Sequence, residues 1–153
     1  MTIVQRIKVP TLIVFLSIIL SACSQNEPNR IYQQLSHDNY EDTLQNLDIA
    51  ISEHNYRIIH RSNIGQAIRD RGDKDYPLST VISFCNITYA KEMMDINSDL
   101  INDMPCIVTV REEVEGVIVG TKLMKINPDE PLQNDFAKRI NKNLKSIIEA
   151  TVE

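Results

Sequence analysis

Residues 106–124 restrict the fold of this chain more than any other segment, because they have the pattern of two strands joined by a tight turn. Residues 106–111 alternate between the two faces expected of a half-buried strand. Residues 113–116 supply a turn that contains glycine, and residues 117–124 return as the partner strand. The chain is therefore expected to contain an antiparallel sheet.

Two segments have the spacing of apolar side chains that an amphipathic helix needs. The first begins after Asp38 or Asn39, either of which can act as the N-cap, and ends near Asn55. The second begins at Asp129 as the cap, with Pro131 in its first turn. The apolar positions of this last helix are Leu132, Phe136, Ile140, Leu144 and Ile148.

Three further strands and a third helix complete the expected domain. The strands are predicted at residues 31–35, 56–60 and 80–85, and the helix runs from the Asn86 cap to about Ile96. The charged, turn-rich residues 61–77 are predicted to be a loop with room for one helical turn. Strands mixed with long helices predict an α+β fold with two layers, in which helices pack on one face of a mostly antiparallel sheet.

Residues 1–22 are predicted to be an export signal. Arg6 and Lys8 precede an apolar run of about ten residues, and no acidic side chain accompanies them. As a helix, such a run rises only about 15 Å, which is half the hydrocarbon thickness of a bilayer. A cleaved signal is therefore favoured over a permanent membrane span.

The motif Leu20-Ser21-Ala22-Cys23 resembles the lipobox of bacterial lipoproteins. The resemblance implies that Cys23 is acylated, that cleavage makes it the first residue, and that two or more acyl chains anchor it stably. Ser24, where Asp would signal retention, implies the outer membrane and a periplasm-facing domain. Residues 23–30 then form a lipidated tether and residues 31–153 a single domain. The alternative is an ordinary cleaved signal with a coincidental cysteine.

The charge of the chain argues against nucleic acid as a partner. The full sequence has 16 basic and 21 acidic residues. Removal of residues 1–22 takes away Arg6 and Lys8 and leaves a net charge of −7. A surface of this sign repels phosphate backbones and anionic membrane surfaces.

Four short motifs occur in a characteristic order along the chain. Phe84-Cys85-Asn86, Tyr89-Ala90, Met104-Pro105-Cys106 and a hairpin ending at Gly116 resemble the bacterial family catalogued as domain of unknown function 302, over roughly residues 31–151. That family often has Pro after the Asn, where this chain has Ile87. The resemblance implies a curved antiparallel sheet backed by helices, similar to the TATA-binding-protein fold, and frequent pairing as a homodimer. It implies no settled activity.

Cys85 and Cys106 are the candidate reactive residues. Outside the cytoplasm two remaining cysteines tend to oxidise, and an even count suits a disulfide. If their strands are antiparallel, both residues share one edge of the sheet, where a bridge needs a Cα separation of about 5.5–6 Å. The alternatives are two unpaired, partly buried thiols, or a functional dithiol that exchanges electrons or holds a soft metal.

Three methionines lie close to these cysteines in the sequence. Thiolate and thioether ligands together suit Cu(I), so Cys85, Cys106, Met93, Met94 and Met104 are weak candidates for a metal site. Methionines at helical spacing more often fill a core, and Cys-x-x-Cys and Met-x-x-Met spacings are absent. No cofactor is therefore expected, except copper under the redox alternative.

No catalytic arrangement stands out in the sequence. No serine lies in a Gly-x-Ser-x-Gly elbow, and the four glycines form no phosphate-binding loop. We therefore expect a binding domain for a small ligand or a protein partner rather than an enzyme. The alternative, from a different class, is a thiol redox or copper-handling protein that uses Cys85 and Cys106.

Overall fold

A computed structural model describes residues 29–153. The predicted export signal, the lipidation site Cys23 and the tether up to residue 28 lie outside the described residues. Within the described part, no helix is both long enough and apolar enough to cross a membrane.

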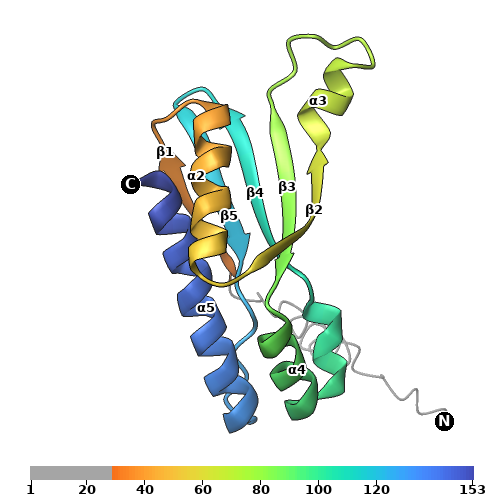
Figure 1. Cartoon of the computed structure of the whole chain (residues 1–153), viewed down its shortest axis with the longest axis vertical. Helices are drawn as coiled ribbons and strands as arrows, with labels where there is room; N and C mark the ends of the chain where they lie inside the picture. Colours follow the sequence, from red (N-terminus) through yellow and green to blue (C-terminus); the bar gives the residue numbers. More distant parts are fainter. Residues whose placement is uncertain (1–28) are drawn as a thin grey trace, which may run out of the picture.

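The described residues form one antiparallel sheet with helices on one face, which confirms the predicted α+β class. The order of the five strands in this part of the chain is β1-β5-β4-β3-β2. Figure 1 shows α2 and α5 side by side over the sheet, with α4 beyond the lower end of its strands. The elements are β1 (Ile31–Ser36), α2 (Tyr40–Glu53), β2 (Arg57–Asn63), α3 (Ile64–Arg69), β3 (Ser79–Cys85), α4 (Ile87–Ile96), the 3₁₀ helix η2 (Ser98–Asp103), β4 (Cys106–Glu113), β5 (Gly116–Lys122) and α5 (Pro131–Val152).

The core lies between the sheet and the two long helices. Alternate side chains of β3, β4 and β5 point toward α2 and α5, because successive strand residues face opposite sides of a sheet. Burying one large aliphatic or aromatic side chain stabilises a fold by roughly 1.5–3 kcal/mol. The largest fully buried apolar side chains are Phe84, Leu47, Ile51, Ile82, Leu144, Ile147, Ile148, Val108, Val110 and Val119.

The helix boundaries follow the predicted caps in two of three cases. Asn39 caps α2 by accepting a hydrogen bond from the Asp42 backbone N–H at 2.9 Å. Asn55 has a φ of 61°, the left-handed conformation predicted after this helix. Asn86 caps α4, also as predicted.

The start of α5 differs from the prediction. Its N-cap is Glu130 rather than Asp129, although Pro131 does occupy the first turn. Leu132 was expected in the core, but 75% of its surface is exposed. Figure 1 shows that the start of α5 extends past the end of the sheet, and Leu132 is the second residue of this helix.

Residues 61–77, predicted to be a loop with room for one helical turn, contain the end of β2 and the helix α3. β2 continues to Asn63 because its backbone pairs with β3 as far as Thr80, with a register shift between Ile58 and His60. α3 follows at once, and Gly65 lies so close to the returning chain that a Cβ there would be 2.5 Å from the Pro77 carbonyl oxygen. Backbone pairing with a distant strand, rather than the local sequence pattern, determines the secondary structure of this region.

Candidate functional site

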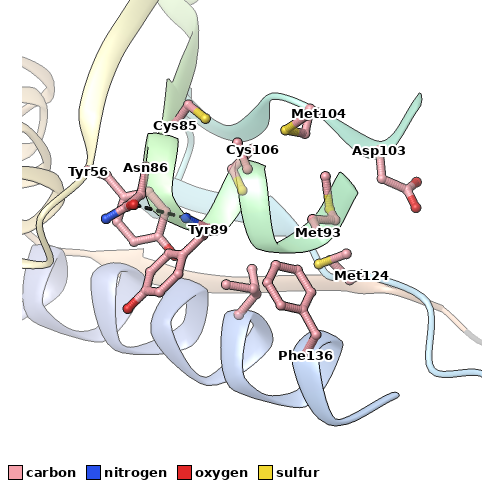
Figure 2. Close-up of a pocket in the computed structure, with 12 residues that line it drawn as sticks. Tyr56, Cys85, Asn86, Tyr89, Met93, Asp103, Met104, Cys106, Met124 and Phe136 are labelled. Carbon is pink, nitrogen blue, oxygen red and sulfur yellow. Dashed lines mark hydrogen bonds between the residues drawn. The ribbon is translucent and has the colours of Figure 1, made fainter. Parts of the chain in front are cut away.

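A pocket opens where β3 ends and β4 begins. The two strands are antiparallel and Phe84 pairs with Cys106, so the last residues of β3 and the first residues of β4 lie together at one end of the sheet. The pocket encloses about 30 Å³ between this end of the sheet, α4 and α5 (Figure 2). Its lining residues are Tyr56, Cys85, Asn86, Tyr89, Ala90, Met93, Asp103, Met104, Cys106, Met124, Phe136 and Ile140.

Sulfur is the chemical signature of this pocket, which we call the sulfur pocket. Five of its lining residues carry a sulfur atom, and they come from five different segments (Figure 2). Cys85 ends β3, Met93 lies on α4, Met104 follows η2, Cys106 begins β4, and Met124 follows β5. Two thiols and three thioethers therefore surround one small cavity.

Two of the three candidate methionines lie at the pocket and one does not. Met93 and Met104 line the pocket, whereas Met94 does not and is 39% exposed. Adjacent helix residues point about 100° apart, and the buried face of α4 carries Met93 while Met94 points toward solvent. Met124 was missed, because it lies far from the other sulfur residues in the sequence and arrives only through the pairing of β5 with β4.

Cys85 and Cys106 are free in the structure, so the disulfide among the three predicted alternatives is not formed. Cys106 pairs with Phe84 and faces the core side of the sheet. Cys85 is one residue further along, and alternation turns its side chain away from the side that Phe84 and Cys106 share. Both thiols nevertheless line the same pocket, with Cys106 the more deeply buried.

Burial keeps both cysteines in the neutral thiol form. It raises the pKa of Cys106 from 9.0 to about 11, and the neighbouring Cys85 adds to this rise. Burial also raises the pKa of Cys85. Reactive cysteines in enzymes have a lowered pKa, because the thiolate is the nucleophile. The pair is therefore poorly suited to rapid nucleophilic chemistry at neutral pH.

Aromatic rings form one wall of the pocket. The ring of Tyr56 meets Phe84 edge-on at a centroid distance of 5.3 Å and lies 5.9 Å from the ring of Tyr89. Burial raises the pKa of Tyr56 to about 12, and its hydroxyl accepts a hydrogen bond from Asn143 Nδ2 at 3.4 Å. This packing holds the wall in place around the sulfur atoms.

Asn86 fixes the start of α4 beside the pocket. Its Oδ1 accepts hydrogen bonds from the backbone N–H groups of Thr88 and Tyr89, at 2.9 and 3.1 Å. Its Nδ2 donates to the Asn55 carbonyl at 2.8 Å, which ties α4 to the turn after α2. The role of Asn86 is thus to position the helix that carries Tyr89 and Met93.

The remaining family-motif residues divide between the two ends of the sheet. Tyr89 and Met104 line the sulfur pocket, and Pro105 lies beside it, after a cis peptide bond. Gly116 lies at the opposite end, in the β4–β5 hairpin, with a φ of 146°. A Cβ at Gly116 would lie 2.6 Å from the Ser36 carbonyl oxygen, so the fold requires glycine at this position.

The described residues offer no second site of comparable chemistry. Within residues 29–153, no group of three or more His, Cys, Asp or Glu side chains could hold a metal ion. Glu112, near the far end of β4, accepts a hydrogen bond from the Leu78 backbone N–H at 2.6 Å and pairs with Arg69 at 3.2 Å. These contacts tie the segment after α3 to the sheet.

Comparison with known proteins gives a family and a fold. The model of a family described as "Domain of unknown function DUF302" matches residues 31–151. The chain resembles the crystal structure of an uncharacterized conserved protein DUF302 from Bacillus stearothermophilus, with a TM-score of 0.70 and 15% sequence identity. That likeness covers 80% of this chain and 98% of the other, and at this identity it shows the fold alone. No curated protein matches the chain.

Proposed function

The chain belongs to the DUF302 family, a domain of unknown function. From its N-terminal sequence and its pocket we propose that it is a lipid-anchored, periplasm-facing domain that binds a small ligand in the sulfur pocket. The observation that carries the proposal is the convergence of five sulfur-bearing side chains on one cavity. Core methionines ordinarily fill space. Here three methionines surround an unfilled cavity that two cysteines also line.

The walls of the pocket suit binding better than catalysis. Apart from Asn86, Asp103 and the two tyrosines, the lining is apolar or sulfur-bearing. Asn86 is engaged in capping α4, and Tyr56 is bonded to Asn143. Binding sites in proteins are commonly apolar clefts with a few oriented polar groups. The raised pKa of both cysteines leaves no activated nucleophile.

The membrane part of the proposal depends on the sequence. Arg6, Lys8 and the lipobox ending at Cys23 support export and acylation. The described domain begins close behind this signal, so the pocket would face the periplasm on a short tether. Assembly into a homodimer stays a prediction of the family resemblance.

A thiol redox protein is the second candidate, because two free cysteines line one pocket. In that reaction Cys85 and Cys106 would form an S–S bond, and their two electrons and two protons would reduce a disulfide of a partner protein to two thiols. The raised pKa of both thiols makes the attacking thiolate scarce. Ligand binding is therefore favoured over electron exchange.

Xenon tests whether the pocket admits a small occupant, because xenon enters dry apolar cavities. The full chain with Cys23→Ser, carrying ¹³C-methyl methionine, is exposed to xenon in detergent and observed by NMR. We expect the methyl signals of Met93, Met104 and Met124 to shift. Met94 is the internal control, because its side chain lies outside the pocket. Unshifted signals from all three, or an equal shift at Met94, would contradict the proposal.

A further inference from the structure

The size of the sulfur pocket restricts its occupant to a few atoms. The pocket encloses about 30 Å³. One water molecule needs roughly 10–15 Å³ by this kind of measure, whereas sites for drug-sized ligands span roughly 300–1,000 Å³. A single metal ion fits this space, with the lining side chains as its ligands, and an organic cofactor does not.

The donor atoms around this space are soft. Cys85, Cys106 and Met104 lie at the joined ends of β3 and β4, and Met93 and Met124 complete the lining (Figure 2). Thioethers combined with thiolates suit Cu(I), whereas Zn²⁺ sites are built from thiolate, imidazole or carboxylate ligands, and Mg²⁺ and Ca²⁺ take oxygen. No histidine lines the pocket, and its one carboxylate belongs to Asp103, which is exposed.

From the size and the donor set we propose that the sulfur pocket is a Cu(I) site, with Cys85 and Cys106 as thiolate ligands and Met104 as a thioether ligand. This inference rests on the proposed function, because it names the ligand of the same pocket. On binding, two S–H bonds break, three Cu–S bonds form (two to thiolates and one to the Met104 thioether), and two protons leave to water. The copper stays Cu(I), so the step needs no oxidant or reductant.

An ion pair lies behind the aromatic wall of the pocket. One Cu(I) ion and two thiolates carry a net charge of −1. The guanidinium of Arg139 lies 5.8 Å from the Tyr89 ring centroid and 5.4 Å from that of Phe136, both of which line the pocket. Glu92 holds Arg139 in this position through an ion pair. Because this ion pair is neutral overall and its side chains are 48% and 41% exposed, it adds little to the stability of an anionic complex.

Competition with bicinchoninate, a coloured Cu(I) chelator, measures the affinity. The protein is the full chain with Cys23→Ser, so that Cys85 and Cys106 are the remaining two of its three cysteines. It is titrated without oxygen in detergent. We expect one Cu(I) per chain, and we expect the release of two protons per ion, because bound thiols lose their protons.

Three variants identify the ligands. The double variant Cys85→Ser, Cys106→Ser should lose more affinity than the roughly 10–100-fold that loss of an outer-sphere partner costs. Met104→Leu, which conserves volume, should weaken binding, and Met94→Leu should leave it unchanged. Far-UV circular dichroism checks that each variant is folded. A second double variant with Ala in place of Ser keeps the test valid if buried hydroxyl groups prevent folding.

The outcomes separate this inference from the proposed function. If xenon shifts the pocket methyl signals but Cu(I) does not bind, the pocket accepts ligands and the copper assignment is wrong. Full Cu(I) affinity in a folded double variant, or equal losses in Met104→Leu and Met94→Leu, would also overturn it. If neither xenon nor Cu(I) enters, both proposals fail.

Discussion

Alkaline pH should destabilise the protein through Cys106, because folding holds this thiol where it resists ionisation. Its pKa is 9.0 when exposed and about 11 in the folded chain, chiefly through burial. The contribution is fully present below pH 9, where the thiol is neutral in both states. It is lost as the pH rises from 9 to 11, because only the unfolded chain then releases the proton.

The size of this loss follows from the pKa shift. Each pKa unit corresponds to about 1.4 kcal/mol, so a rise from 9.0 to about 11 corresponds to a loss on the order of 2–3 kcal/mol. Tyr56, whose pKa is about 12, also destabilises the fold at high pH, but mainly above pH 10. A comparison with a variant that lacks only the Cys106 thiol removes this background.

Urea unfolding followed by far-UV circular dichroism provides the measurement. The full chain with Cys23→Ser is compared with the same chain carrying Cys106→Ala, under reductant, from pH 8 to pH 11. Between these limits the parent should lose about 2–3 kcal/mol more unfolding free energy than the variant. Cys85→Ala is the matched control and should change the profile less, since Cys85 is less buried. Parallel pH profiles for parent and Cys106→Ala would refute the burial of this thiol.

Three further changes test the fold and the anchor. Asn86→Ala should lower the unfolding free energy by about 1–2 kcal/mol through loss of the α4 cap, as measured by urea unfolding. Asn86→Asp should recover most of that loss, and a variant as unstable as Asn86→Ala would contradict the capping role. Gly65→Ala should lower the unfolding free energy by about 1–3 kcal/mol, because the added Cβ would lie 2.5 Å from the backbone at Pro77 and Ser79. An unchanged urea midpoint would show that the two backbone segments are further apart than this. Cys23→Ser should abolish incorporation of labelled palmitate in a bacterial host, and continued labelling would exclude Cys23 as the acylated residue.

Local patterns sufficed for the elements whose signals lie within a few residues. Asn39 and Asn86 were identifiable as caps because each accepts from backbone groups two or three positions later. The β4–β5 hairpin was visible from its alternation and its turn at Gly116. The sequence also implied that Cys85 and Cys106 would meet if β3 and β4 were antiparallel, because the end of one strand then lies beside the start of the next.

The features that were missed depend on distant partners. Met124 reaches the pocket because β5 ends beside β4, and no local pattern marks it. The choice between Met93 and Met94 depends on the rotation of α4 against the sheet. Leu132 was misassigned because the length of the sheet, not the apolar spacing of α5, decides which turns are covered.

A crystal structure of the reduced protein loaded with Cu(I) tests the central claim most directly. Anomalous scattering at the copper edge locates the metal without any assumption about its ligands. The account predicts one peak in the sulfur pocket, between the sulfur atoms of Cys85, Cys106 and Met104. A pocket without copper, with peaks only at exposed side chains such as His60, would contradict it.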